Sequence, residues 1–193
     1  MTGRSGEDLA LIERFVGGDR SAFDEIVRAH EDRVFSICMR IMANREAALD
    51  ATQETFLTLF RKADRFTGKA AFSTWLYRVA VNTCYDQLRK EKRRRADRLP
   101  EHLDPVDRAA GDGFASAEMR PELEHALSRI PDEFRSAVIL SDLEDLPISE
   151  IAEILRIPPG TAKSRIFRGR RLLADILRNQ NDASRRPRDD QDA

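Results

Sequence analysis

The sequence predicts an all-α protein made of two small helical domains that are joined by a flexible linker. Apolar residues recur at helical spacing through both halves, and no stretch shows the alternation of a β-strand. Between the halves, residues 97–115 mix proline, glycine and acidic residues without an apolar period, which is typical of a linker. The expected ranges are 8–96 for the first domain, 97–115 for the linker and 116–178 for the second domain. A polar tail, 179–193, is expected to be disordered.

The first domain begins with three amphipathic helices. The first covers Asp8–Val16, the second is capped by Asp19 or Ser21 and runs to about Met42, and the third follows Asn44 and runs to about Ala63. In the second helix, His30 lies on the apolar stripe and is expected in the core. The third helix is expected to bury Leu49, Thr52, Phe56, Leu59 and Phe60, and to expose Asp50, Gln53, Glu54, Leu57 and Arg61.

A loop, Asp64–Ala71, precedes a helix of about Phe72–Arg95 that begins with aromatic residues and ends in a cationic run. Aromatic faces stack on unpaired bases and cations follow a phosphate backbone, so this mixture suits single-stranded nucleic acid. Phe72, Leu76 and Val79 are expected in the core, whereas Trp75 and Tyr77 fit either role. The cationic run also fits a solvated helix end, because cations are favourable at a helix C-terminus. On this stretch alone the two readings are equally favoured.

The second domain is expected to contain a helix from about Ser116, a helix with Pro131 in its first turn, and a helix-turn-helix motif. The motif comprises a helix over Ile148–Leu155, a break at Pro158–Gly160 and a second helix from about Thr161. One face of that second helix is apolar: Ala162, Ile166, Gly169, Leu173 and Ile176. The other carries Thr161, Ser164, Arg165, Arg168 and Arg171, with Lys163, Phe167 and Arg170 on the flank. Such a face fits the major groove of duplex DNA.

Composition limits the other possibilities. The chain has 193 residues, a formal net charge of -1 and 35% charged residues, so its clustered cations are more informative than its overall charge. No apolar run is long enough for a membrane span, and Met1–Asp8 lacks the features of a signal peptide, which predicts a cytoplasmic protein without membrane insertion. Cys38 and Cys84 are expected to be buried free thiols. No spacing indicates a metal site or a cofactor.

Three segments resemble extracytoplasmic-function (ECF) sigma factors. DATQETFLTLFRKADRF is similar to their region 2.2, FSTWLYRVAVNTCYDQLRKEKRR to regions 2.3–2.4, and LPISEIAEILRIPPGTAKSRIFRGRRLL to region 4.2. The resemblance spans about Leu9 to Leu177, including the order of the segments and the linker between them. It implies a dissociable subunit that directs bacterial RNA polymerase to specific promoters and helps open them, and that makes no bond itself.

The resemblance also implies roles for individual residues. Those matching the surface that docks on the coiled coil of the polymerase β′ subunit are Asp50, Gln53, Glu54 and Leu57. Those matching the loop and helix that hold the unpaired −10 element are Phe66, Lys69, Trp75, Arg78 and Asn82. Those matching the helix that reads the −35 element are Thr161, Lys163, Ser164, Arg165, Phe167, Arg168 and Arg171. The implied partners are the core polymerase, through its β′ and β subunits, promoter DNA and an anti-sigma protein.

Two positions depart from the family pattern. Pro147 stands where a Ser or Thr often caps the first helix of the motif, and Arg156 stands where the turn often has glycine. The alternative function is a stand-alone helix-turn-helix transcriptional regulator, which would bind palindromic duplex tightly without polymerase. A nucleic-acid enzyme is a further alternative, but no carboxylate cluster, histidine pair or nucleophile motif favours it.

Overall fold

The computed structural model describes residues 2–68, 70–96 and 121–185, and these ranges contain helices but no strand. The all-α prediction is confirmed. The elements in chain order are α1 (Thr2–Val16), α2 (Arg20–Met42), α3 (Arg45–Lys62), the 3-10 turn η1 (Ala63–Arg65), α4 (Phe72–Ala96), α5 (Pro121–Ser128), α6 (Asp132–Val138), the π-helical turn η2 (Ile139–Leu143), α7 (Ile148–Leu155) and α8 (Pro159–Arg185).

Side-chain caps fix where the helices of the first half begin. Asp19 precedes α2 and accepts a hydrogen bond from the backbone N–H of Ser21 at 3.0 Å, which satisfies a donor that the helix leaves without a partner. Arg14, in the last turn of α1, donates to the same carboxylate at 2.7 Å. Asn44 caps α3 by accepting from the N–H of Ala47 at 2.9 Å. The predicted caps of these two helices are therefore confirmed, with Asp19 rather than Ser21 capping α2.

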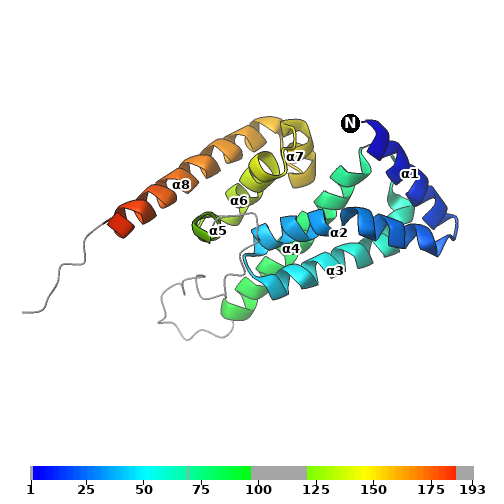
Figure 1. Cartoon of the computed structure of the whole chain (residues 1–193), viewed down its shortest axis with the longest axis horizontal. Coiled ribbons are helices and arrows are strands. Elements are labelled where there is room, and N and C mark those ends of the chain that lie inside the picture. The colour runs from blue at the N-terminus through cyan, green and yellow to red at the C-terminus, as the bar shows by residue number, and fades with distance from the viewer. Residues whose placement is uncertain (1, 69, 97–120, 186–193) are drawn as a thin grey trace, which may run out of the picture.

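Helices α1 to α4 form a bundle in which α2 contacts each of the other three (Figure 1). Within it, His30 is buried as predicted, and its Nε2 lies 2.9 Å from Oδ1 of Asp8 on α1, so the polar ring has a partner in the core. Cys38 and Cys84 are buried free thiols, also as predicted.

The expected buried face of α3 is partly wrong. Leu49 and Phe60 are 49% and 46% exposed, while Ala48, Ala51 and Thr55 are buried with Phe56 and Leu59. The helix is rotated so that its small residues face the bundle. Alanine side chains let neighbouring helix backbones approach closely, and the larger Leu49 and Phe60 are turned to the outside. The hydroxyl of Thr55 is satisfied by its own helix, through a 2.7 Å hydrogen bond to the carbonyl of Ala51.

In the second half of the chain, α5, α6 and α7 all pack against α8. The predicted apolar stripe of α8 is confirmed: Ala162, Ile166 and Gly169 are buried, and Leu173 and Ile176 are partly buried. The predicted break at Pro158–Gly160 is too long, because α8 already begins at Pro159. Proline is well suited to the first helical position, where its missing N–H would have no helical partner.

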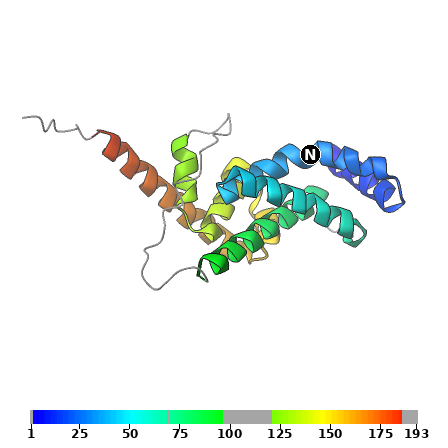
Figure 2. The same ribbon diagram turned by 90° about the horizontal axis from the view of Figure 1, so that it is seen from below.

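The C-terminal boundary also differs from the sequence expectation. A disordered tail was expected from residue 179, but α8 continues to Arg185, since each added residue of an existing helix gains a backbone hydrogen bond. Figures 1 and 2 show this end of α8 extending past the other helices. The linker prediction, 97–115, the expected helix start at Ser116 and residues 186–193 lie outside the described residues.

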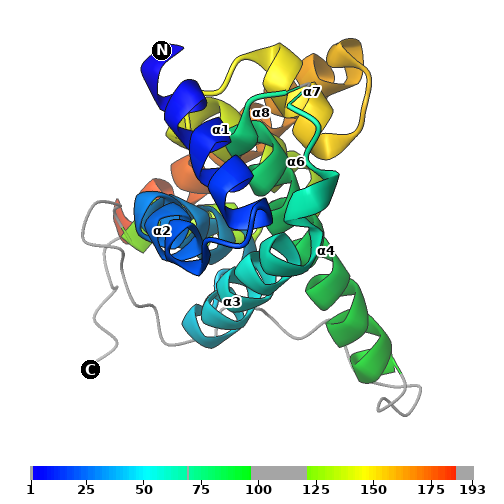
Figure 3. The same cartoon turned by 90° about the vertical axis from the view of Figure 1, so that its right-hand side faces the viewer.

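The two halves contact one another directly. Helix α7 packs on α4, whose other side faces α3 (Figure 3), and α2 contacts α5, α6 and η2. Buried apolar side chains of both halves belong to one continuous cluster, from Ile12 in α1 to Ile166 in α8. In this structure the helix-turn-helix motif is therefore docked on the N-terminal bundle.

Gly169 lies where α8 packs tightly against α6. A Cβ at this position would lie 2.5 Å from Cγ2 of Val138 and 3.0 Å from the carbonyl oxygen of Phe134. We expect Gly169→Ala to lower the free energy of unfolding by about 1–3 kcal/mol, because the packed helices would have to move apart. Urea unfolding followed by circular dichroism measures this change.

Gly160, in the first turn of α8, provides the matched control because a Cβ there would meet nothing within 4 Å. Gly160→Ala should be neutral or stabilising by up to about 1 kcal/mol. A Gly169→Ala protein as stable as the unmodified chain would show that α6 and α8 are not this close.

Candidate nucleic-acid interface

Helix α8 presents its cationic face to solvent. Lys163, Ser164, Arg168 and Arg171 are exposed, and Phe167 is the most exposed large apolar side chain of the described residues, at 69%. Thr161 and Arg165 are partly buried. An exposed helix with cations, a hydroxyl and an aromatic ring on one side has the shape and the donors that contact a major groove. The seven residues that the resemblance assigned to −35 recognition thus share one helix and largely one face.

The turn before α8 is fixed by its backbone. Arg156 ends α7 in the left-handed conformation, with φ of 54°, and the N–H of Ile157 bonds to the carbonyl of Ala152 at 3.0 Å. Glycine is common at such a position because other residues adopt positive φ at some cost. At the other end of α7, Pro147 occupies the cap position and makes no side-chain capping bond. Both departures noted in the sequence are thus accommodated without loss of the motif.

Arg170 has a structural partner instead of a free guanidinium. Its Nε and Nη2 donate to the two oxygens of Asp142, at 2.9 and 2.6 Å, and Nη2 also donates to the hydroxyl of Ser141. The hydrogen bond from Arg170 lowers the pKa of the Asp142 carboxyl. Because this bidentate pair ties α8 to η2, Arg170 is committed to the fold and lies beside the reading face.

A second cationic surface lies on α4, around a cleft of about 350 Å³. Trp75 forms an aromatic wall, Arg78 and Asn82 follow it at successive helical turns, and Val79 lies between them. Basic side chains from three other segments also line the cleft: Lys62 of α3, Arg65 of η1 and Arg156 of the helix-turn-helix motif. The remaining lining residues are Thr58, Thr83 and the acidic Asp86. An aromatic face surrounded by cations and an amide can stack on an unpaired base and hold its phosphates.

Only some of the residues assigned to the −10 element line this cleft. Trp75, Arg78 and Asn82 line it, and the ring of Phe66 lies 5.9 Å from that of Trp75, behind the cleft wall. Lys69 lies outside the described residues. Phe72 and Leu76 are core as expected, Tyr77 is also buried, and Val79 is only partly buried. Sequence reasoning missed Lys62, Arg65 and Arg156, because only the fold brings these distant cations together.

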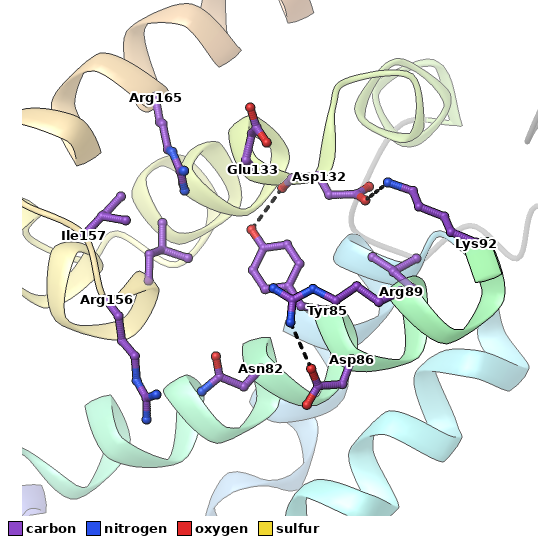
Figure 4. Close-up of a pocket in the computed structure, with 12 residues that line it drawn as sticks. Asn82, Tyr85, Asp86, Arg89, Lys92, Asp132, Glu133, Arg156, Ile157 and Arg165 are labelled. Carbon is purple, nitrogen blue, oxygen red and sulfur yellow. Dashed lines mark hydrogen bonds and ion pairs between the residues drawn. The ribbon is translucent and has the colours of Figure 1, made fainter.

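A larger cleft of about 650 Å³ lies between α4 and the part of the helix-turn-helix motif that comprises the end of α7, the turn and Arg165 of α8. Figure 4 shows Arg165 of α8 and Arg156 of the turn facing Asn82 and Tyr85 of α4 across it. At one end the Tyr85 hydroxyl donates to the carbonyl of Asp132 at 3.3 Å. Burial raises the pKa of the Tyr85 phenol, so it stays a neutral donor. In this arrangement Arg165 points into the space between the halves.

The outer face of α3 lies between two grooves. Asp50, Gln53, Glu54 and Leu57 line a polar groove of about 430 Å³ toward α4. Three of the four, together with Leu49, Phe23 and Phe60, line an apolar groove of about 520 Å³ toward α2. The predicted docking residues are therefore adjacent and exposed. Leu49 and Phe60, which the sequence placed in the core, add apolar surface to the same face.

Comparison with known proteins shows which protein family the chain resembles. The family model for Sigma-70 region 2 matches residues 26–94, and that for Sigma-70, region 4 matches residues 120–173. The chain is 39% identical to the ECF RNA polymerase sigma factor SigE of Mycolicibacterium smegmatis over 83% of its own length and 64% of that protein's length. It is 32% identical to the ECF RNA polymerase sigma factor SigW of Bacillus subtilis, covering 87% of this chain and 95% of that one.

The chain belongs to the ECF RNA polymerase sigma factors. A third relative, the ECF RNA polymerase sigma factor SigM of Mycobacterium tuberculosis, is 35% identical over 88% of this chain and 84% of its own. The recognition from three sequence segments is thereby confirmed, and this chain is a sigma factor that directs RNA polymerase to promoters.

Solved structures agree on the fold. The sigma factor RpoE of Bartonella quintana, solved with the anti-sigma factor NepR, matches 81% of this sigma factor with a TM-score of 0.66 at 23% identity. CnrH, solved with the cytosolic domain of CnrY, matches 90% with a TM-score of 0.64 at 20% identity. Among the described residues, no helix has both the length and the apolar character that spanning a bilayer requires.

The Arg170–Asp142 pair gives a pH-dependent prediction. Arg170→Gln should raise the pKa of Asp142 toward its ordinary value of 3.8, because the guanidinium that stabilises the carboxylate is removed. A carboxyl group whose pKa is lowered by folding stabilises the fold at pH values above its pKa in the unfolded chain. That contribution is lost as the pH falls through the lowered pKa of the folded chain. NMR titration of the Asp142 carboxyl carbon measures the shift.

Unfolding followed at several pH values provides the second readout. The stability advantage of the unmodified chain over Arg170→Gln should be present at neutral pH and should vanish on acidification below 3.8. Arg171→Gln, on the exposed face next to it, should leave the Asp142 titration unchanged. An equal shift in both variants would mean that the pair does not form in solution.

Proposed function

We propose that this sigma factor divides promoter recognition between two surfaces, with α8 on duplex DNA at the −35 element and the α4 cleft on the unpaired strand of the −10 element. The observation that carries the proposal is the difference in shape between the two cationic surfaces. The α8 face is convex and largely exposed on one helix, as suits a groove-reading helix. The α4 surface is hollow and has an aromatic wall, which suits a base that has left its stack.

At the −35 element, Arg168, Arg171 and Lys163 supply the cations that contact phosphates and guanine edges. The hydroxyls of Ser164 and Thr161 can donate or accept hydrogen bonds closer to the helix than the longer cationic side chains do. The ring of Phe167 offers apolar contact to a base. These side chains are held at fixed spacing, because the opposite side of α8 packs through Ile166 and Gly169 on the rest of the domain.

At the −10 element, the cleft would stabilise an open strand more than a closed duplex. Extruding a base costs a few kcal/mol of stacking, so a site that favours melting must return that energy through new contacts. Trp75 provides a stacking face, Asn82 an amide for a base edge, and Arg78 with the neighbouring cations a path for phosphates.

The exposed face of α3 is the proposed docking site for the β′ subunit of core polymerase. It combines exposed polar groups at Asp50, Gln53 and Glu54 with apolar Leu57 beside a hydrophobic groove. Interfaces often combine an apolar centre with a polar rim in this way. Polymerase, through its β′ and β subunits, carries out the chemistry of RNA synthesis. The sigma factor itself acts in the cytoplasm without enzymatic activity, and a cognate anti-sigma protein is a further partner.

Run-off transcription tests the proposal as a whole. Core polymerase is incubated with this chain on a library of promoter fragments, and start sites are read by sequencing. The proposal expects start sites that share two separated sequence elements and that disappear when the chain is omitted. A library without any enriched start site would contradict it.

Arg168 tests the duplex-reading face. Arg168→Ala should weaken binding of the polymerase complex to promoter duplex by about 1–3 kcal/mol if the side chain contacts a base. If it contacts a phosphate, the slope of log affinity against log salt should become shallower by about 0.9. Fluorescence anisotropy with labelled promoter DNA at several salt concentrations measures both quantities.

Arg178 is the matched control on the same helix, since it lies farther along α8 and pairs with Asp175 at 3.4 Å. Arg178→Ala should retain most of the affinity. Equal losses in the two variants would argue for a general charge effect and against a reading face centred on Arg168.

The docking face is tested by Gln53→Ala combined with Leu57→Ala. Both side chains are exposed, so the fold should persist while affinity for core polymerase falls by about tenfold or more. Glu46→Gln, exposed in the first turn of the same helix, is the control. Binding to immobilised core enzyme is the readout, with circular dichroism confirming helix content. Unchanged affinity of the double variant would move the docking site elsewhere.

A further inference from the structure

The two cysteines of the sequence meet inside the N-terminal bundle. Cys38 lies on α2 and Cys84 on α4, and these two helices pack against one another. Neither side chain is exposed to solvent, and the thiol of Cys84 forms a hydrogen bond with the sulfur of Cys38. The proposed function uses neither residue, so this nucleophilic pair has no assigned role.

A third helix reaches the pair through Thr52. This residue of α3 is the second hydrogen-bond partner of Cys38. Thr52 is only partly buried, and it lines the apolar groove of about 520 Å³ between α2 and α3. The Cys38 sulfur therefore lies one side chain away from a surface groove, at the junction of α2, α3 and α4.

The two thiols differ in their readiness to react. The hydrogen bond from Cys84, together with that from Thr52, lowers the pKa of the Cys38 thiol, because both favour a negative charge on its sulfur. The interaction with Cys38, together with burial, raises the pKa of Cys84. Since the thiolate is the nucleophile, Cys38 is the attacking sulfur and Cys84 is a neutral thiol beside it. Redox-sensing cysteines often combine a thiol of low pKa with such a neighbour.

We propose that Cys38 and Cys84 form a peroxide-reactive pair, and that their oxidation to a disulfide weakens the docking of α3 on core polymerase. First, the Cys38 thiolate attacks hydrogen peroxide: an S–O bond forms, the O–O bond breaks, and hydroxide leaves Cys38 as a sulfenic acid. That hydroxide takes up the proton that the Cys38 thiol released. Next, the Cys84 sulfur attacks the Cys38 sulfur, so that the S–S bond forms and the S–O bond breaks. The second hydroxide leaves as water with the Cys84 proton, and the two electrons lost by the thiols reduce the peroxide.

The burial of the pair selects the oxidant. Hydrogen peroxide is small and uncharged, so it can pass from the groove to Cys38 when the partly buried Thr52 moves, and local openings of this kind are a general property of folded proteins. A bulky anionic thiol reagent would be excluded. In the cytoplasm proposed for this chain thiols are kept reduced, so the disulfide would be a transient signal.

Helix α3 connects the pair to polymerase, and this step rests on the docking function proposed for that helix. Thr52, which contacts Cys38, directly precedes Gln53 of the proposed docking face. A covalent bond draws the Cys38 sulfur toward Cys84 and away from Thr52, because bonded sulfurs lie closer together than hydrogen-bonded ones. The groove beside Leu57 then changes shape, and a face that fits its partner in the reduced chain loses contacts.

Mass spectrometry of the full chain tests the chemistry. The reduced chain is exposed to hydrogen peroxide, unfolded, alkylated at its remaining thiols and digested. We expect a pair of peptides joined through Cys38 and Cys84, which should disappear on treatment with dithiothreitol. Free thiols at both positions in a sample that already contains oxidised methionine would overturn the disulfide, and so would higher sulfur oxides without the joined peptides.

Binding to immobilised core polymerase tests the consequence. The oxidised chain should bind about fivefold or more weakly than the reduced chain, and dithiothreitol should restore its affinity. The matched control is the double variant Cys38→Ala, Cys84→Ala after the same peroxide treatment. Its affinity should stay at the reduced level, because methionine can still be oxidised in it but no disulfide can form. Cys84→Ser, which is closer in size, takes its place if circular dichroism shows that the double variant has lost its helices.

Each failure has its own signature. An equal loss of polymerase affinity in the control variant would overturn the role of the pair, because other lesions would then explain the loss. A disulfide that leaves polymerase affinity unchanged would overturn the link through α3. Failure of the proposed docking function gives a different result, namely a reduced chain that does not bind core polymerase, and the joined peptides would still decide whether the disulfide forms.

Discussion

The packing of one half on the other depends on a buried guanidinium as well as on the apolar core. Arg135 is 1% exposed, and its Nη1 donates to the carbonyl of Ile41 at 2.6 Å, where the last turn of α2 leaves acceptors without helical partners. Its Nη2 donates to the carbonyls of Ser128 and Ile130, both at 2.9 Å. One side chain therefore links the end of α2 to the α5–α6 connection. Removing it would leave several buried acceptors unpaired at once.

Helix α4 has to serve two environments with one face. In this structure that face meets α7, and in the proposed function it meets a strand with phosphates and bases. The carboxylates of Glu150 and Glu153 on α7 and the phosphates of a DNA strand are all anionic, so Thr74 and Arg78 suit either partner. The rings of Phe66 and Phe72 pack against each other and against Trp75 of the cleft wall, with ring centroids 5.5 to 6.1 Å apart.

Sequence reasoning succeeded where the determining signals are local. The caps at Asp19 and Asn44, the amphipathic stripe of α8 and the turn at Arg156 all depend on neighbours within a few residues. It failed at Leu49 and Phe60, because part of the buried face of α3 consists of the small residues Ala48, Ala51 and Thr55, which give a weak hydrophobic pattern. The contacts of Glu144 and Arg135 across the halves join residues that are distant in the chain, and no local pattern records them.

Arg156 links the geometry of both DNA-facing surfaces. Its backbone makes the bend between α7 and α8, while its side chain adds a cation to the cleft on α4. A glycine at this position would ease the backbone but leave the cleft with one positive charge fewer. The side chain thus couples the turn of one reading unit to the electrostatics of the other.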